Sequence, residues 1–153
     1  MEGRFDLINS RLLLYGMSDW PRYIRTVTCL LKPSTGRVEI HDLDWVWYDS
    51  SNNIISDKWE WVKVLREAAE ERGLDVNCGS RAAGWMKDAG LVNVKAVEYY
   101  CPFGGEWEGP EEMKAFGEYV ASEMPRMFTH VISKVTERKG YSKEQIEARR
   151  AQR

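Results

Sequence analysis

A strand, a helix and a second strand within the first 45 residues constrain the fold of this chain most strongly. Residues 4–14, RFDLINSRLLL, are apolar enough for a strand that runs into a loop, and RVEIHDLDW forms a second such segment. Between them, Ser18 and Asp19 are candidate N-caps and Pro21 lies in the first turn of a helical pattern. One face of that helix is apolar and consists of Trp20, Ile24, Val27 and Leu31. The order predicts a βαβ unit with parallel strands, and the short apolar strands predict a sheet that is covered on both faces.

Two further helices are expected after the polar loop YDSSNNIIS. Asp57 and Glu60 in DKWE match a capping box, and the helix that follows should end at Gly73. Its apolar stripe consists of Trp61, Val62, Leu65 and Ala69. A shorter helix is predicted in SRAAGWMKDAG, with Gly90 as its end.

The last third of the chain combines one strand pattern with helical patterns. LVNVKAVEYYCPFGG alternates apolar and polar residues, which predicts a half-exposed strand at the edge of the sheet. From Pro110 onward the pattern is helical, with a break expected at Pro125. A final polar helix, YSKEQIEARRAQR, should be capped by Ser142.

Composition limits the class of protein. With 153 residues, the chain is long enough for a single domain over residues 1–153. The net charge of −2 argues against a nucleic-acid binder, because the only basic run is the terminal RRAQR. No segment approaches the roughly 18 apolar residues of a membrane span. Three widely spaced cysteines (Cys29, Cys78 and Cys101) and no apparent signal peptide predict a cytoplasmic or nuclear protein.

The motifs resemble a known family in their order and spacing. FDLINSRLLL, followed by a helix and then by LKPSTGRVEIHDLDW, is similar to S-adenosylmethionine-dependent methyltransferases of the LaeA-like type, which are common in fungal secondary metabolism. The family pattern is FDLIHSR, a helix, and LKPGGWVEIQ followed by acidic residues. The resemblance continues through KWEWVKVLREAAEERGLDV and KDAGLVNVKAVEYYCPFGG, so that it covers residues 5–145.

The resemblance implies a partial class I methyltransferase fold. In the family, a strand with a glycine-rich turn and a second strand ending in an acid bind the methyl donor, and neither motif is found in these residues. The family's final strand, ending near YGRKP, has no counterpart either. We therefore expect an α/β, Rossmann-like sheet of about three strands, truncated at both ends. S-adenosylmethionine would bind only if a partner supplied the other half.

Polar residues follow both predicted strands and form the candidate site. Because ligands bind at the carboxyl ends of parallel strands, the residues after the first strand should neighbour those after the second. The resemblance implies that the first group meets donor and acceptor, and that the second lines the acceptor pocket. The two groups are Asn9, Ser10 and Arg11, and His41, Asp42 and Asp44.

The second group has three interpretations. His41 is a candidate general base, because histidine is the side chain most often used for proton transfer. A metal site is disfavoured, because His41 and Asp42 are adjacent in a strand and point to opposite faces. Alternatively, the acids hydrogen-bond loop backbone, and Asp44 helps to fix WVWYD. Arg11 could clamp a carboxylate of donor or substrate, or form an ion pair with Asp6, Asp42 or Asp44.

Six of the seven tryptophans and the second histidine are given an expected role. Trp20, Trp45, Trp47 and Trp59 could form an aromatic wall for a flat substrate, whereas Trp61 and Trp85 are expected in the core. His130 is expected to be a packed or surface residue of the last long helix.

Two hypotheses for function follow. The chain is either an enzyme or a non-catalytic binding and regulatory module of methyltransferase origin. As an enzyme it would act on a small molecule, within an assembled methyltransferase or as a cofactor-independent isomerase or cyclase. In both cases, strand edges without a neighbour should recruit a second copy of the chain or a methyltransferase-family subunit.

Overall fold

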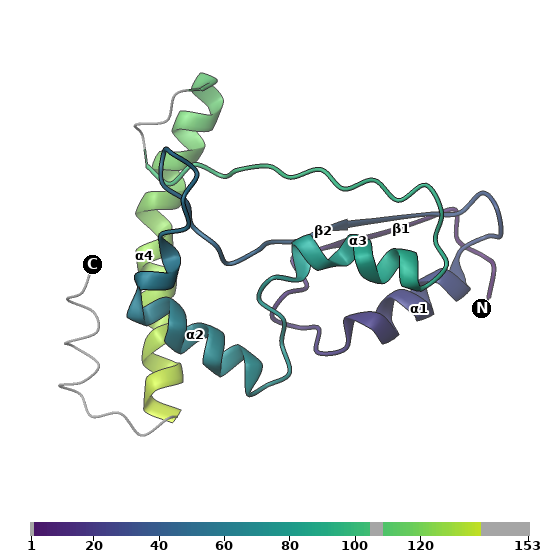
Figure 1. Cartoon of the computed structure of the whole chain (residues 1–153), viewed down its shortest axis with the longest axis horizontal. Helices are drawn as coiled ribbons and strands as arrows, with labels where there is room; N and C mark the ends of the chain where they lie inside the picture. The colour runs from purple at the N-terminus through teal and green to yellow at the C-terminus, as the bar shows by residue number, and fades with distance from the viewer. Residues whose placement is uncertain (1, 105–108, 139–153) are drawn as a thin grey trace. The chain divides into compact units, whose positions relative to one another are not determined.

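The computed structural model describes residues 2–104 and 109–138, of which 125 and 127–138 are described by their backbone alone. Two compact units are formed: Met1–Lys58 with Arg66–Ala96, and Trp59–Leu65 with Val97–Arg153. The elements are β1 (Leu7–Arg11), α1 (Trp20–Leu30), β2 (Arg37–His41), the 3-10 helix η1 (Ser56–Lys58), α2 (Glu60–Glu70), α3 (Cys78–Asp88) and α4 (Glu111–Arg138). Figure 1 labels the strands and the α-helices. The predicted α/β class is confirmed, as a small parallel sheet with α-helices.

The βαβ unit forms as predicted in the first compact unit. β1 and β2 are parallel, with Leu7 opposite Arg37 and Arg11 opposite His41, and α1 connects them. The Asp19 side chain accepts a hydrogen bond from the backbone N of Arg22 at 2.9 Å, which confirms Asp19 as the N-cap of α1.

Only one face of this sheet is covered within the described residues, so the expectation of two covered faces is wrong. Exposure alternates along both strands, and the helix-facing residues are Ile8, Ser10, Val38 and Ile40. The Ser10 and Tyr23 hydroxyls are hydrogen-bonded, which places α1 on this face. Because α3 contacts both α1 and β2, the two helices share that face and leave the other open.

The core of the first unit lies beneath these helices. Its buried apolar residues are Leu14, Trp20, Ile24, Val27, Leu31, Trp45, Ala69, Val76, Cys78 and Ala82. The stripe predicted for α1 is therefore confirmed in full.

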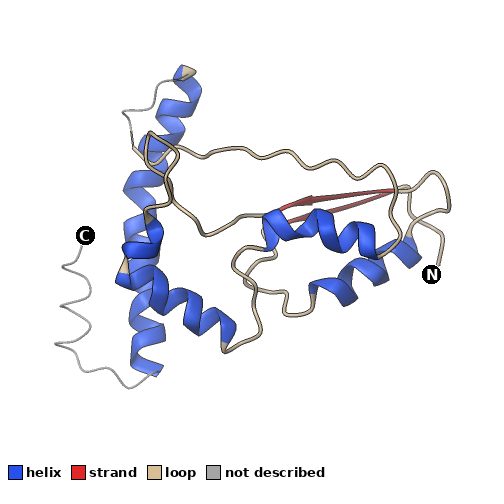
Figure 2. Cartoon of the chain, viewed as in Figure 1, coloured by secondary structure: helices blue, strands red, loops and turns tan. Residues whose placement is uncertain are grey.

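The predicted third strand is not formed in the described residues. The sheet has two strands, and Figure 2 shows the segment after α3 as loop. Val92, Val97 and Tyr99 are exposed by 82%, 69% and 87%. Alternation of apolar and polar residues favours an extended backbone, but a strand also needs a hydrogen-bonded neighbour. No strand of the described chain takes that position beside residues 91–103.

α2 begins later than the capping-box pattern predicts. It starts at Glu60, and Asp57 lies in the preceding 3-10 turn. Asp57 instead accepts a hydrogen bond from the Arg66 guanidinium at 2.6 Å, and the same guanidinium donates to the backbone O of Trp45 at 2.7 Å. Arg66 thus ties the loop after β2 to α2. Gly73 follows the end of α2, as predicted, with a φ of 68°.

α4 runs through Pro125 without the predicted break. An interior proline removes one intrahelical hydrogen bond and crowds the preceding turn, which can kink a helix without ending it. The predicted helix capped by Ser142 and the side chain of His130 lie outside the described parts. No helix among the described residues is long and apolar enough to cross a membrane.

Candidate functional site

The carboxyl ends of β1 and β2 lie side by side, as the sequence predicts. Arg11 is opposite His41 in the register, and the backbone N of Leu12 donates to the backbone O of His41 at 3.0 Å. The side chains of the first group do not share one face, however. Asn9 and Arg11 are exposed on the open face with His41, whereas Ser10 is buried beneath α1.

Asp42 fixes the two loops that leave the strands. One carboxylate oxygen accepts a hydrogen bond from the backbone N of Leu13 at 2.7 Å. The other accepts from the backbone N of Leu43 at 3.0 Å. Both oxygens of Asp42 are thus engaged with loop backbone.

Asp44 supplies a cap to a helix that is distant in sequence. The N-cap residue of α3, Asn77, makes no side-chain capping bond. Asp44 Oδ1 instead accepts from the backbone N of Ser80, in the first turn of α3, at 3.0 Å. Gly79 permits this approach, since a Cβ there would lie 3.0 Å from the backbone O of Asp42 and 3.1 Å from Asp44 Oδ1. The acid therefore joins the end of β2 to the start of α3.

Cys78, the first residue of α3, is fully buried next to these acids. Burial, followed by the negative charge of Asp42 and its hydrogen bond and by the charges of Asp75 and Asp44, raises the pKa of the Cys78 thiol far above its ordinary value. A thiol in this environment stays protonated and is a poor nucleophile.

His41 is exposed and lightly constrained. Its side chain is 62% exposed, and its Nε2 lies 3.9 Å from Glu39 Oε2. The described residues contain no group of three or more His, Cys, Asp or Glu side chains that could hold a metal ion. A role for His41 as a base remains a prediction.

Arg11 and Asn9 differ in the interactions of their side chains. Asp6, one expected partner of Arg11, pairs instead with Lys32 at 2.9 Å. In the parts of the chain that are described, Arg11 forms no ion pair, so its guanidinium is open to a ligand. Asn9 Nδ2 donates to Glu39 Oε2 at 3.3 Å, across the strand pair.

The six tryptophans considered above form three separate pairs. Trp20 stacks on Trp85 with ring centroids 5.8 Å apart and an interplanar angle of 12°. Trp45 packs edge-on against Trp47 at 5.6 Å, and Trp59 stacks on Trp61. Trp20 and Trp45 are only 2% and 4% exposed, so they belong to the core and not to an open wall. Trp61 and Trp85, expected in the core, are half-buried.

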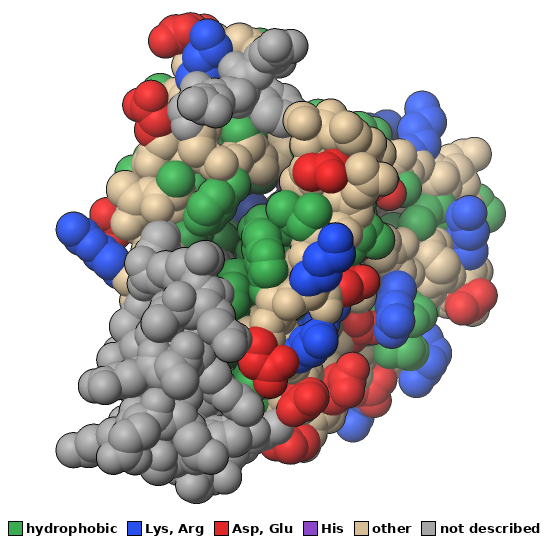
Figure 3. Space-filling view, turned by 60° about the vertical axis from the view of Figure 1, so that its left-hand side comes forward, with side chains coloured by type: hydrophobic (Ala, Val, Ile, Leu, Met, Phe, Trp, Pro, Cys, Tyr) green, Lys and Arg blue, Asp and Glu red, His purple; other side chains and the backbone are tan. Residues whose placement is uncertain are grey.

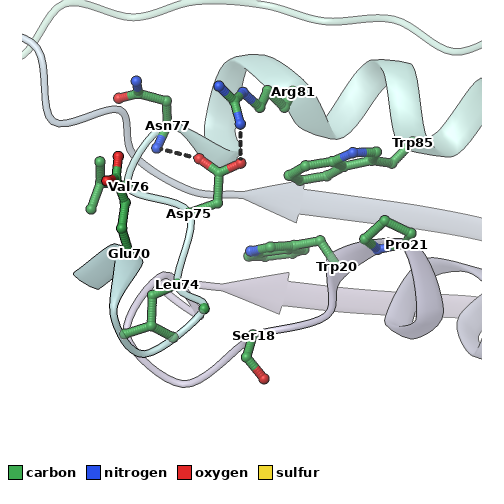
Figure 4. A pocket seen from close by; sticks show the side chains of 11 residues that line it. Ser18, Trp20, Pro21, Glu70, Leu74, Asp75, Val76, Asn77, Arg81 and Trp85 are labelled. Atoms are coloured by element: carbon green, nitrogen blue, oxygen red, sulfur yellow. Dashed lines mark hydrogen bonds and ion pairs between the residues drawn. The ribbon is translucent and has the colours of Figure 1, made fainter. Parts of the chain in front are cut away.

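Sequence reasoning missed a hollow of about 360 Å³ between the start of α1, the end of α2 and the start of α3 (Figure 4). The Asp75 carboxylate lies in it and accepts hydrogen bonds from Arg81 at 2.6 Å and from the backbone N of Asn77 at 2.9 Å. No single motif could have revealed this hollow, because its walls come from three segments that only the fold brings together. Its lining residues are Ser18, Trp20, Pro21, Glu70, Gly73, Leu74, Asp75, Val76, Asn77, Arg81 and Trp85.

Two buried polar atoms of the lining residues have no hydrogen-bond partner among the described residues. They are Trp20 Nε1, a donor, and Asn77 Oδ1, an acceptor. A buried polar group without a partner costs about 1 to 3 kcal/mol. Figure 4 shows the nitrogen-bearing edge of Trp20 directed toward the loop that carries Asp75, and its opposite edge toward Pro21.

The described residues on one face of the molecule carry charges of both signs. Acidic and basic side chains are interspersed on the face drawn in Figure 3, in keeping with the near-balanced charge of the chain. This surface gives no electrostatic footprint for a nucleic acid.

Comparison with known proteins places the chain near two fungal regulators. It is 28% identical over 116 residues to secondary metabolism regulator LAE1 of Pyricularia oryzae, covering 75% of this chain and 35% of that protein. It is also 28% identical over 110 residues to secondary metabolism regulator laeA of Coprinopsis cinerea, covering 65% of this chain and 27% of that protein. No family model and no solved structure matches it. The chain thus spans about a third of these relatives, and the matches support its relationship to the LaeA-like, methyltransferase-like proteins of fungal secondary metabolism.

Proposed function

We propose that this chain is a regulatory binding module of fungal secondary metabolism, and that it acts by adding its βαβ unit to the sheet of a methyltransferase-family partner. The two relatives are secondary metabolism regulators by name, and the matched segments cover only 35% and 27% of their lengths. In the absence of such a partner, we expect a second copy of the chain to occupy the same edge.

The open outer edge of β1 is the observation that carries this proposal. The backbone N of Arg37 donates to the O of Asp6, and the N of Leu12 donates to the O of His41. In a parallel ladder, the residues of a strand point alternately to the two sides. Ile8 and Ser10 therefore direct their backbone groups to β2, and those of Leu7, Asn9 and Arg11 point outward.

No strand of the described chain pairs with that outer edge. Exposed apolar side chains accompany it, since Phe5, Leu7 and Leu12 are 40%, 52% and 63% exposed. An unpaired strand with apolar flanks is a template for another strand, and β-strand addition is a common mode of recognition.

The chemistry at the strand ends also favours binding over catalysis. Asp42 and Asp44 hold loop and helix backbone, so the two acids that follow His41 have structural partners. S-adenosylmethionine would be supplied through the partner. Radiolabelled methyl incorporation by the chain alone would contradict this.

Proton transfer by His41 is the second candidate function. It is favoured by the exposure of His41 on the open face, where Arg11 is its direct neighbour across the strand pair. A guanidinium beside an imidazole could orient an acidic substrate for deprotonation.

Amide exchange distinguishes edge pairing from the alternatives. With LAE1 of Pyricularia oryzae as a probe of the partner class, the amides of Leu7, Asn9 and Arg11 should become protected on binding. Asn9→Pro removes one outward amide N–H, which can then no longer donate to a partner strand, so binding should be abolished. Proline is tolerated at sheet edges only, and pairing would turn β1 into an inner strand. Asn9→Ala is the matched control, since it removes the bond to Glu39 but keeps the amide. Equal binding by the two variants would refute edge pairing.

A further inference from the structure

The hollow beside Trp20 combines features that point to a ligand. Trp20 is only 2% exposed, yet its indole N–H has no hydrogen-bond partner among the described residues. The Asp75 carboxylate lines the same hollow, where Arg81 and the backbone of Asn77 hold it in place. A donor without a partner and a fixed acceptor thus belong to two residues that line one hollow of about 360 Å³.

We infer that this hollow binds a small, flat, neutral molecule that carries a carbonyl beside an N–H, as a cyclic amide does. The carbonyl would accept from Trp20 Nε1, and the ligand N–H would donate to a free lone pair of Asp75. A carboxylate oxygen has more than one acceptor site, so the existing bonds from Arg81 and Asn77 can remain. This inference does not depend on the proposed edge pairing, because none of the hollow's lining residues belongs to β1 or β2.

The charges around the hollow disfavour an anionic ligand. Asp75 and Glu70 are acidic and Arg81 is basic, and the ion pair between Arg81 and Asp75 already balances two of them. An anion would meet the remaining carboxylate of Glu70, whereas a neutral amide is held by its own carbonyl and N–H. The apolar walls formed by Trp85, Leu74 and Val76 suit the faces of a flat ring.

Access to the donor requires a local adjustment. Trp20 Nε1 exposes less than 1 Å², so a carbonyl oxygen reaches it only when rim side chains move aside. Leu74 lines the hollow and is half-buried, so its side chain can move while the bond from Arg81 to Asp75 remains. Binding should therefore be accompanied by a measurable change at the indole N–H itself.

The test uses the full chain with ¹⁵N-labelled tryptophan and two probes, 2-pyridone and the cyclic dipeptide of glycine. The Trp20 indole N–H signal, assigned by its loss in Trp20→Phe, should shift downfield and saturate. Asp75→Asn should weaken binding at least tenfold, which corresponds to about 1.4 kcal/mol. Trp59→Phe, in the other compact unit, should leave the titration unchanged. N-methyl-2-pyridone, which lacks the N–H, should bind at least tenfold more weakly than 2-pyridone.

Three results would overturn the inference. They are an unshifted Trp20 signal at millimolar probe, a titration that Asp75→Asn leaves intact, and equal binding of the N-methylated probe. If Trp20→Phe fails to fold, the signal can be assigned through the loss of signals in the other tryptophan variants, and Asp75→Asn still decides the outcome. None of these results bears on edge pairing, which is measured at the amides of β1.

Discussion

Asp44 Oδ1 accepts a hydrogen bond from the backbone N of Ser80 at 3.0 Å, 36 residues away in the chain. This bond satisfies one of the free amides at the start of α3, where the N-cap residue Asn77 provides no side-chain bond. The polar residues that follow β2 therefore have a structural role. They connect the end of the sheet to the helix that covers it.

Replacing Asp44 should destabilise the chain measurably. Asp44→Ala should lower the free energy of unfolding by about 1 kcal/mol, as expected for the loss of a helix cap. Asp88→Ala, an exposed change at the other end of α3, should stay within about 0.5 kcal/mol of the parent chain. Urea denaturation measures both, and equal effects would show that the Asp44 bond contributes nothing.

Two glycines of α3 should respond to alanine in opposite directions. At Gly79 a Cβ would meet the backbone of Asp42 at 3.0 Å, whereas at Gly84 nothing lies within 4 Å. Gly84→Ala should therefore raise stability by roughly 0.5 to 1 kcal/mol through helix propensity. Gly79→Ala should lower it, because the strand-end loop must move.

Thermal or chemical unfolding of the two glycine variants gives the comparison directly. Both substitutions have the same intrinsic helix propensity, so their difference isolates the close contact at Gly79. Stabilisation by both alanines would mean that α3 does not pack closely against residues 42–44.

The Cys78 thiol should resist alkylation in the folded chain. At pH 8, iodoacetamide should modify the exposed Cys29 readily and Cys78 only after unfolding. Peptide mapping by mass spectrometry distinguishes the two sites. Equal modification rates in the native chain would contradict the buried position of Cys78.

The raised pKa of Cys78 also predicts the direction of a pH effect on stability. Because the fold favours the protonated thiol, its contribution is complete below the ordinary thiol pKa of about 8.5 and is lost as the pH rises above that value. Between pH 8 and pH 10, the parent chain should therefore lose more stability than Cys78→Ala does.

The βαβ unit could be predicted because each pattern that specifies it lies within a short stretch of sequence. The cap at Asp19, the stripe of α1 and the parallel strand pair each follow from residues close in sequence. The prediction of a third strand was wrong, because alternating apolar and polar residues specify an extended backbone but not the neighbouring strand that it must pair with. The hollow beside Trp20 could not be foreseen, because Asp75 and Trp20 are brought together only by tertiary packing.

Removing the His41 side chain should leave stability nearly unchanged. The imidazole is 62% exposed and has one weak contact, so His41→Ala should keep the melting temperature within a few degrees. If the chain has a catalytic activity that uses His41 as a base, the same variant should lose about a hundredfold in turnover. A large drop in melting temperature would instead assign His41 a structural role.

Sedimentation velocity at low micromolar concentration tests edge pairing, because an open β1 edge should recruit a second copy of the chain when no partner is present. We expect the parent chain and Asn9→Ala to sediment as associated species, and Asn9→Pro to shift toward the monomer. A compact parent chain that sediments as a monomer and melts cooperatively would contradict it.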